Sequence, residues 1–245
     1  MEHTGKANKI VVLGDVHIPY QDNDAIKLVL MFIKWYKPQV LIMNGDIVDA
    51  TRLSKYRKEP DTKRFSEEID LARSFLNDIK MATGRWCVSY FIFGNHELRC
   101  QKYLIDNAPE LYEVFSLEDL LQLTSRFIIV NESMKENYLH IGNWYVGHWN
   151  KVNKHSGYTA KNLIDDRGVN IVQGHTHRLA IVQRRFIDRL ITGVEGGCLC
   201  TLTPDYVVKP NWSTGFVVID YGVAQLAHIQ GQLLYFGRKR LAIRG

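Results

Sequence analysis

The chain has 245 residues, 46% hydrophobic and 23% charged, with four cysteines and a formal net charge of +5. This length and composition predict one globular domain over residues 1–245 that folds without disulfides. No run approaches the roughly 18 apolar residues of a membrane-spanning helix, which argues against a membrane protein. With no apolar leader after Met1, we expect a cytoplasmic protein whose cysteines are buried and reduced.

The first 100 residues alternate strand and helix patterns. The first predicted element is a buried strand at 9–13. A helix follows that Asp22, Asn23 or Asp24 can cap, that Pro38 stops and that carries the apolar stripe Ile26, Val29, Leu30 and Ile33; a strand at 39–43 comes next. The predicted elements continue with a helix that carries Ile69, Ala72, Leu76 and Ile79 and ends at Gly84, and with a strand at 86–93.

The rest of the chain becomes mainly strand. Residues 101–123 are predicted to be helical, with a capping box at Ser116 and Asp119. One helix at 158–166 follows, among strands at 126–130, 138–141, 144–146, 169–173, 180–183, 190–193, 214–221, 224–230 and 233–236. This order predicts an α/β fold of two packed sheets with helices outside.

Five short motifs follow predicted strands, and each begins with glycine. They are Gly14-Asp15-Val16-His17, Gly45-Asp46-Ile47-Val48-Asp49, Gly94-Asn95-His96-Glu97, Gly147-His148 and Gly174-His175-Thr176-His177. Glycine permits tight turns, and ligand sites in α/β sheets form at the carboxyl ends of strands. Since five of the nine histidines lie in these motifs, we expect their side chains to meet at one sheet edge.

This combination of side chains is typical of a metal centre. Carboxylate and amide oxygens with neutral imidazoles, and no thiolate, suit Mn, Fe, Co, Ni or Zn. A carboxylate can also bridge two ions that share a hydroxide. Each motif alone is more often an ordinary turn or a surface histidine, but the five in this order favour a metal site.

The order D-x-H, G-D-x-x-D, G-N-H-E, G-H, G-H-x-H over residues 10–178 resembles the calcineurin-like metallophosphoesterase superfamily. The resemblance implies a calcineurin-like sandwich of two mixed β-sheets flanked by helices, and two divalent ions, Mn²⁺ first, with Fe, Ni, Co or Zn as alternatives. The segments Gly196-Gly197-Cys198 and Asn211-Trp212 also resemble small phosphoesterases of phages and prophages.

The resemblance further implies a role for each motif residue. The first ion would be held by Asp15, His17, Asp46 and His177, with Asp46 bridging, and the second site would be completed by Asn95, His148 and His175. His96 would act as general acid or stabilise charge on the phosphate oxygens, and Asp49 would hydrogen-bond His96 and raise its pKa.

Two departures argue against a Ser/Thr protein phosphatase. That branch has a phosphate-gripping arginine directly after the second motif, whereas here Ala50-Thr51-Arg52 follows Asp49. It also has glycine after D-x-H, where this chain has Ile18-Pro19.

The substrate is predicted from the basic residues. They are Arg52, Lys55, Arg57, Lys58, Lys63, Arg64, Arg99, Lys102, Lys151, Lys154, His155 and the run Arg238-Lys239-Arg240. They are either scattered solvated charge or a rim for a polyanion, where Arg52 and Arg99 would contact substrate. Tyr56, Tyr103 and Trp149 are either packing residues or surfaces on which bases stack.

The predicted activity is hydrolysis of phosphodiester, nucleotide or nucleic-acid phosphate bonds by a hydroxide that bridges two metal ions. A general phosphomonoesterase for small metabolites is the first alternative. The second is a binding module that keeps the fold without catalysis.

Overall fold

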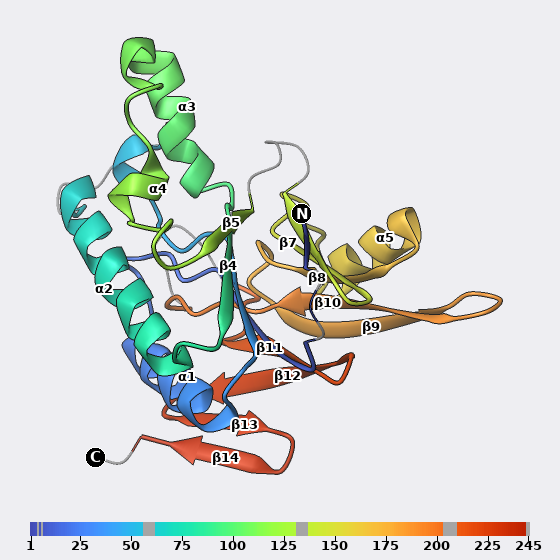
Figure 1. Cartoon of the computed structure of the whole chain (residues 1–245). Helices are drawn as coiled ribbons and strands as arrows, with labels where there is room; N and C mark the ends of the chain where they lie inside the picture. Colours follow the sequence, from blue (N-terminus) through green and yellow to red (C-terminus); the bar gives the residue numbers. More distant parts are fainter. Residues whose placement is uncertain (4, 6, 56–61, 131–136, 203–209, 244–245) are drawn as a thin grey trace.

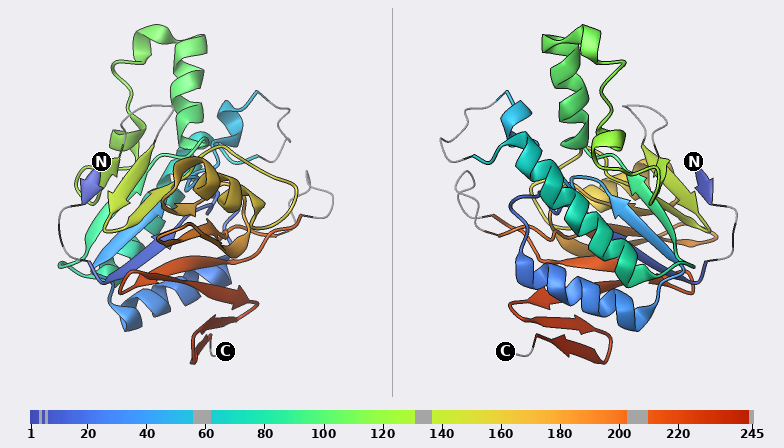
Figure 2. Two further views of the ribbon diagram at one scale, coloured as in Figure 1. Left: turned by 90° about the vertical axis from the view of Figure 1, so that its right-hand side faces the viewer. Right: turned by 60° about the vertical axis from the view of Figure 1, so that its left-hand side comes forward.

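The computed structural model of the chain describes residues 1–3, 5, 7–55, 62–130, 137–202 and 210–243. Two mixed β-sheets pack face to face, and helices cover their outer faces (Figures 1 and 2). The predicted sandwich of two mixed sheets is therefore confirmed.

The larger sheet has eight strands. Its parallel half is formed by β2 (Lys9–Leu13), β3 (Val40–Asn44), β4 (Val88–Ile92) and β5 (Ile128–Val130). Its antiparallel half is formed by β11 (Gly215–Asp220), β12 (Val223–Gln230), β13 (Leu233–Phe236) and β14 (Lys239–Ala242). The order is β14-β13-β12-β11-β2-β3-β4-β5, so β2 joins the two halves.

The smaller sheet has six strands. In spatial order they are β1 (Glu2–His3), β6 (Tyr138–Ile141), β7 (Trp144–Gly147), β8 (Asn170–Gln173), β10 (Leu190–Gly196) and β9 (Leu179–Arg185). Strands β7, β8 and β10 run parallel, and β6 and β9 run antiparallel to their neighbours β7 and β10.

The helices complete four layers. Helices α1 (Asn23–Tyr36) and α2 (Phe65–Thr83) cover the larger sheet, and α5 (Tyr158–Arg167) covers the smaller one (Figure 1). Alternation along β2 assigns its side chains to layers: Val11 and Leu13 pack under the helices, whereas Ile10 and Val12 pack between the sheets. None of the described helices is long and apolar enough to cross a membrane.

The first helix begins and ends where the sequence predicts. The Asp22 side chain accepts the N–H groups of Asp24 and Ala25, and Lys37 takes a left-handed conformation before Pro38. The predicted apolar stripe is only partly right, because Ile26 and Leu30 are half-buried. The face that meets the sheet is wider and is formed by Ala25, Leu28, Val29, Phe32, Ile33 and Tyr36.

The segment predicted to be helical at 101–123 is divided among three short elements. They are α3 (Glu97–Asn107), the 3-10 turn η2 (Pro109–Leu111) and α4 (Leu117–Leu120). Helix α3 begins inside the third motif and projects from the body of the molecule (Figure 2). Because proline has no N–H to donate, Pro109 cannot continue the helix. Ser116 caps α4 by accepting the N–H of Asp119 at 3.4 Å, as predicted.

Two further boundaries differ from the sequence pattern. The strand predicted from residue 86 begins at Val88, and Trp86 is 83% exposed. The basic run 238–240 leads into β14, an edge strand that was not predicted and that three strands separate from β2. These cations therefore lie on the sheet edge away from the strands that carry the first three motifs.

Candidate metal centre

All five motifs turn at the place where the two sheets present their carboxyl edges. Three follow the neighbouring strands β2, β3 and β4, and two follow the neighbouring strands β7 and β8. A cavity of about 250 Å³ opens there, and its lining includes His17, Asp46, His96, His175 and His177. The expected convergence of distant motifs is thus present in the fold.

Backbone geometry aims these side chains. Asp15, His17, Asp46, His175 and His177 all have positive φ, between 50° and 71°. Such conformations cost non-glycine residues on the order of 1–3 kcal/mol each and persist only where the surrounding structure requires them. Gly45 is equally constrained, since a Cβ there would lie 2.7 Å from the Nδ1 atom of His148. The turns are therefore shaped for the site rather than for local stability.

One group of potential ligands consists of Asp15, His17 and His177. The Nε2 atom of His177 lies 3.2 Å from Asp15 Oδ1 and 3.0 Å from the Nε2 atom of His17. All three side chains are buried. Two imidazole nitrogens and a carboxylate oxygen therefore point at one spot, within the separation that a shared ion allows.

A second group consists of Asp46, His148 and His175. The Nε2 atom of His148 lies 3.1 Å from Asp46 Oδ2, and the rings of His148 and His175 lie 5.3 Å apart. Asp46 Oδ2 is also 3.8 Å from the Nε2 atom of His17, which belongs to the first group. The Asp46 carboxylate thus lies between the two groups.

The hydrogen bonds of these side chains fit metal ions. His148 donates its Nδ1–H to the carbonyl of Asn44 at 2.8 Å, which leaves the lone pair of Nε2 facing Asp46 Oδ2. Two acceptors this close require a cation between them or a proton on the ring. The Oδ1 atom of Asn95 is buried and accepts no hydrogen bond from the described residues. The Asn95 oxygen and the His148 Nε2 nitrogen therefore have lone pairs without a hydrogen-bond partner among the described residues. Such oxygen and imidazole nitrogen atoms are ligands that divalent transition metals bind.

Asp49 contacts two histidines. Its Oδ1 atom lies 3.1 Å from the Nδ1 atom of His96, the partner that the family resemblance implies. The same Oδ1 atom lies 2.9 Å from the Nδ1 atom of His17. The contact with His17 was not predicted. Because a partner at Nδ1 leaves Nε2 as the acceptor, Asp49 holds the Nε2 lone pair of His17 toward the first group.

His96 stands at the cavity beside an arginine. Its Nδ1–H donates to the carbonyl of Asp49 at 2.8 Å, and Arg99 donates from Nη2 to its Nε2 atom at 3.1 Å. Burial disfavours protonation, but the charges of Asp46 and Asp49 outweigh it and raise the pKa of His96 above its ordinary value. Arg99 thus lies in the site, whereas Arg52 donates its N–H groups to the carbonyls of Thr62 and Lys63.

The residues considered for base stacking lie elsewhere. Trp149 packs beside Tyr138 and Arg167, and Tyr103 lines a separate apolar cavity next to α3. Tyr56, like Arg57 and Lys58, falls outside the described residues. Of the described tryptophan, tyrosine and phenylalanine side chains, Trp212 lines the metal-site cavity, and its ring centroid lies 4.3 Å from that of His177. The only sequence signal for it was the Asn211-Trp212 resemblance.

Glu97 organises the second motif, a role not assigned from sequence although Glu97 ends the third motif. Its fully buried carboxylate accepts the backbone N–H groups of Asp46, Ile47 and Val48 at 2.7–3.1 Å. It also accepts the N–H of Gly94 at 2.8 Å. Glu97 therefore shapes the turn that carries Asp46.

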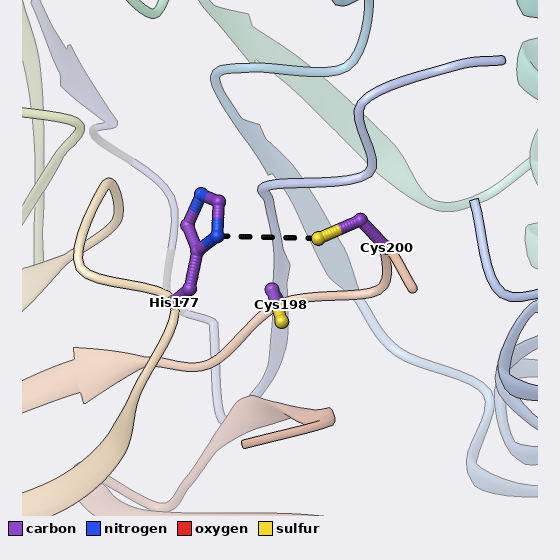
Figure 3. A group of neighbouring side chains, drawn as sticks. All are labelled: His177, Cys198 and Cys200. Atoms are coloured by element: carbon purple, nitrogen blue, oxygen red, sulfur yellow. Dashed lines mark hydrogen bonds between the residues drawn. The ribbon is translucent and has the colours of Figure 1, made fainter. Parts of the chain in front are cut away.

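A thiol lies behind one of the histidines. The Nδ1 atom of His177 is 3.9 Å from Cys200 Sγ, and Cys198 lies beside them (Figure 3). All four cysteines are free and buried, as predicted. Residues 198 and 200 belong to no strand but form isolated bridges with Thr214 and Gln21. His177 therefore faces Asp15 on one side and a thiol on the other.

Comparisons with known proteins place the chain among phosphoesterases. The Gene 54 protein of Mycobacterium phage D29 is 28% identical over 86% of this chain and 88% of its own length. That of Mycobacterium phage L5 is 26% identical over 98% of both chains. The phosphoesterase YfcE from E. coli is 14% identical, with 96% of this chain and all of that chain covered and a TM-score of 0.46. The profile of the calcineurin-like phosphoesterases matches residues 8–179, and the chain belongs to this family.

Proposed function

We propose that the protein hydrolyses phosphodiester bonds, including those of nucleotides or nucleic acids, with two divalent ions, Mn²⁺ first. Asp15, His17 and His177 would hold one ion, and Asn95, His148 and His175 the other. Asp46 would bridge them. The position of the Asp46 carboxylate, 3.1 Å from His148 and 3.8 Å from His17, is the observation that carries this proposal.

Bound divalent ions lower the pKa of a water molecule and neutralise charge on phosphate oxygens. The protein contributes the proton. His96 donates from Nε2 to the departing oxygen while its Nδ1–H stays on the carbonyl of Asp49. The carboxylate of Asp49, which contacts Nδ1, favours the protonated form that this step needs. Arg99, which donates from Nη1 to the carbonyl of Asp49 at 2.8 Å, would hold its guanidinium beside His96 and contact a phosphate oxygen.

The cavity wall supports an ester with a flat substituent. Trp212 lines the cavity next to His177, and Val152 adds an aliphatic surface. A nucleobase can stack on tryptophan, and such contacts are worth about 1–3 kcal/mol per base. This combination favours nucleotide-like diesters over small polar monoesters.

The test strips the protein of metal and reloads it with Mn, Ni, Zn or Mg singly. Bis-p-nitrophenyl phosphate and single-stranded DNA are compared with p-nitrophenyl phosphate and mononucleotides. We expect hydrolysis only after reloading, and faster with diesters. Faster monoester hydrolysis would establish the phosphomonoesterase alternative. A protein that holds two ions but hydrolyses none of the four substrates would be a binding module.

A further inference from the structure

The residue that follows the last motif has unusual surroundings for an arginine. Arg178 lines the same cavity as His96 and His177, yet it is only 9% exposed. A guanidinium stays charged at any physiological pH, and burying it is costly unless an anion accompanies it. The position of Arg178 therefore calls for a negative partner.

The described residues provide a hydrogen-bond acceptor for only part of the Arg178 guanidinium. Arg178 donates from Nη1 to the carbonyl of Asn153 at 2.6 Å, and its Nε atom is buried with no acceptor among the described residues. Within the same part of the chain, no carboxylate forms an ion pair with it. The neighbouring Thr176 hydroxyl also lines the cavity and is buried with no hydrogen-bond partner there. The Nε–H group of Arg178 and the hydroxyl of Thr176 therefore border one cavity, each without a hydrogen-bond partner among the described residues.

The arginine at position 52 does not meet this need. Its guanidinium is engaged by the carbonyls of Thr62 and Lys63, and it does not line the metal-site cavity. Among the described residues that line that cavity, the arginine is Arg178, which follows His177 at the end of the smaller sheet. A planar guanidinium with free N–H groups matches two phosphate oxygens better than an ammonium does.

We propose that Arg178 and Thr176 form an anion subsite that binds the non-bridging oxygens of the substrate phosphate. The subsite rests on the proposed function, since the same phosphate must reach the metal ions. Arg178 would then orient the ester from the His177 side, while Arg99 reaches it from the His96 side.

The test compares Arg178→Met, Arg178→Lys and Thr176→Val with wild type after metal loading. For Arg178→Met we expect KM for bis-p-nitrophenyl phosphate and Ki for inorganic phosphate to rise roughly tenfold to hundredfold. The value of kcat should change less than KM, because the contact is made before the reaction as well as during it. The KM and Ki of Arg178→Lys should lie between those of wild type and Arg178→Met. Thr176→Val should raise both constants by less than Arg178→Met does.

The matched control is Arg73→Met. Arg73 also donates to a backbone carbonyl, that of Leu120, but it lies on α2 away from the metal groups. We expect its KM and Ki to equal those of wild type. If Arg178 only anchors Asn153, Arg178→Met will lose metal or kcat with Ki unchanged, and the proposal is overturned. Should Arg178→Met not fold, an unchanged Ki in Arg178→Lys and Thr176→Val overturns it equally.

Direct binding separates this proposal from the proposed function. Calorimetry with inorganic phosphate needs no turnover, so it works even if the wild type hydrolyses nothing. Weaker phosphate binding by metal-loaded Arg178→Met supports the subsite in either case. Equal binding by the variant and the wild type rejects the subsite and leaves the phosphoesterase proposal standing.

Discussion

Two buried acids, Asp49 and Glu97, organise the metal centre without belonging to its two ligand groups. Asp49 orients His17 and His96, and Glu97 accepts four backbone N–H groups around Gly45 and Gly94. Metal centres depend on such outer contacts because they set the tautomer and direction of each ligand. Asp49 and Glu97 therefore position other residues, whereas Asp15 and Asp46 belong to the ligand groups, and the spacing of the acids in the sequence does not distinguish these roles.

Replacing His96 tests the proton donor. We expect His96→Ala to keep its metal content and to lose about 10²–10⁴-fold in turnover, since leaving-group protonation is removed. Turnover and bound metal are measured on purified, Mn-loaded protein. His228→Ala, an exposed histidine on β12, is the control and should equal wild type. Wild-type turnover in His96→Ala would refute the assignment.

Replacing Asp46 tests the bridge. Asp46→Asn removes the charge that both ligand groups share, so we expect at most one ion per chain and a larger loss of turnover than for His96→Ala. Metal analysis by mass spectrometry after dialysis gives the stoichiometry. Two ions per chain with full activity would contradict the bridging role.

At the scale of elements, helix α2 supports the second motif through a carboxyl group. Glu68 on α2 accepts the N–H of Ala50, whose φ is +51°. Burial, with the charge of Asp49, raises the pKa of Glu68 from 4.5 to about 8. The helix thus holds the turn after Asp49 with a carboxyl that is neutral below that pH.

This raised pKa predicts a pH-dependent stability. In the unfolded chain Glu68 ionises above about pH 4.5, whereas in the folded protein it stays protonated to about pH 8. The unfolded state therefore binds fewer protons between these values, and the free energy of unfolding falls as pH rises, by at most about 1.4 kcal/mol per unit. Glu68→Gln keeps an acceptor for Ala50 and should remove this part of the slope.

Urea unfolding at pH 5 and pH 8, with chelator present, measures the effect for wild type and Glu68→Gln. Glu67→Gln, an exposed change on the same helix turn, is the control and should retain the wild-type slope. Parallel pH profiles for wild type and Glu68→Gln would show that Glu68 is ionised in the folded protein.

Across the whole molecule, the candidate metal centre lies between two sheets that also pack through apolar side chains. Residues of β2 and β3 pack against residues of β7 and β8 in the core between the sheets. The ligand groups combine motifs from both sheets, so each ion would cross-link them. Metal binding should therefore stabilise the whole sandwich.

Metal removal tests this link. An ion that binds only the folded state, at 100 times its Kd, stabilises that state by about 2.7 kcal/mol. For a chain of this size we expect Tm to fall by roughly 5–10 °C per site on chelation and to recover with Mn²⁺. Differential scanning calorimetry measures the shift, and Asp46→Asn should show a smaller one. An unchanged Tm in the wild type would mean that the ions do not bind across the sheets.

Local patterns predicted most elements of this fold. The cap at Asp22, the stop at Gly84 and the apolar runs of β2 and β3 depend on residues a few positions apart, which is the range that sequence periodicity reports. The segment predicted to be helical at 101–123 is interrupted, because Pro109 cannot continue α3 and Ser116 begins a new helix. The buried face of α1 differs from the predicted stripe, because the sheet beneath the helix decides which residues beside the stripe are also buried.

The fold class, the family and the types of candidate ligand could all be predicted from the sequence, since the five motifs and the strands before them follow one another along the chain. Three features became visible in the folded chain alone: Asp49 contacts His17, Glu97 shapes the turn of Asp46, and Arg178 and Trp212 line the cavity. The residues that line this cavity lie up to 195 positions apart in the chain, as for His17 and Trp212. Strand order and register bring them together, and no local pattern encodes either.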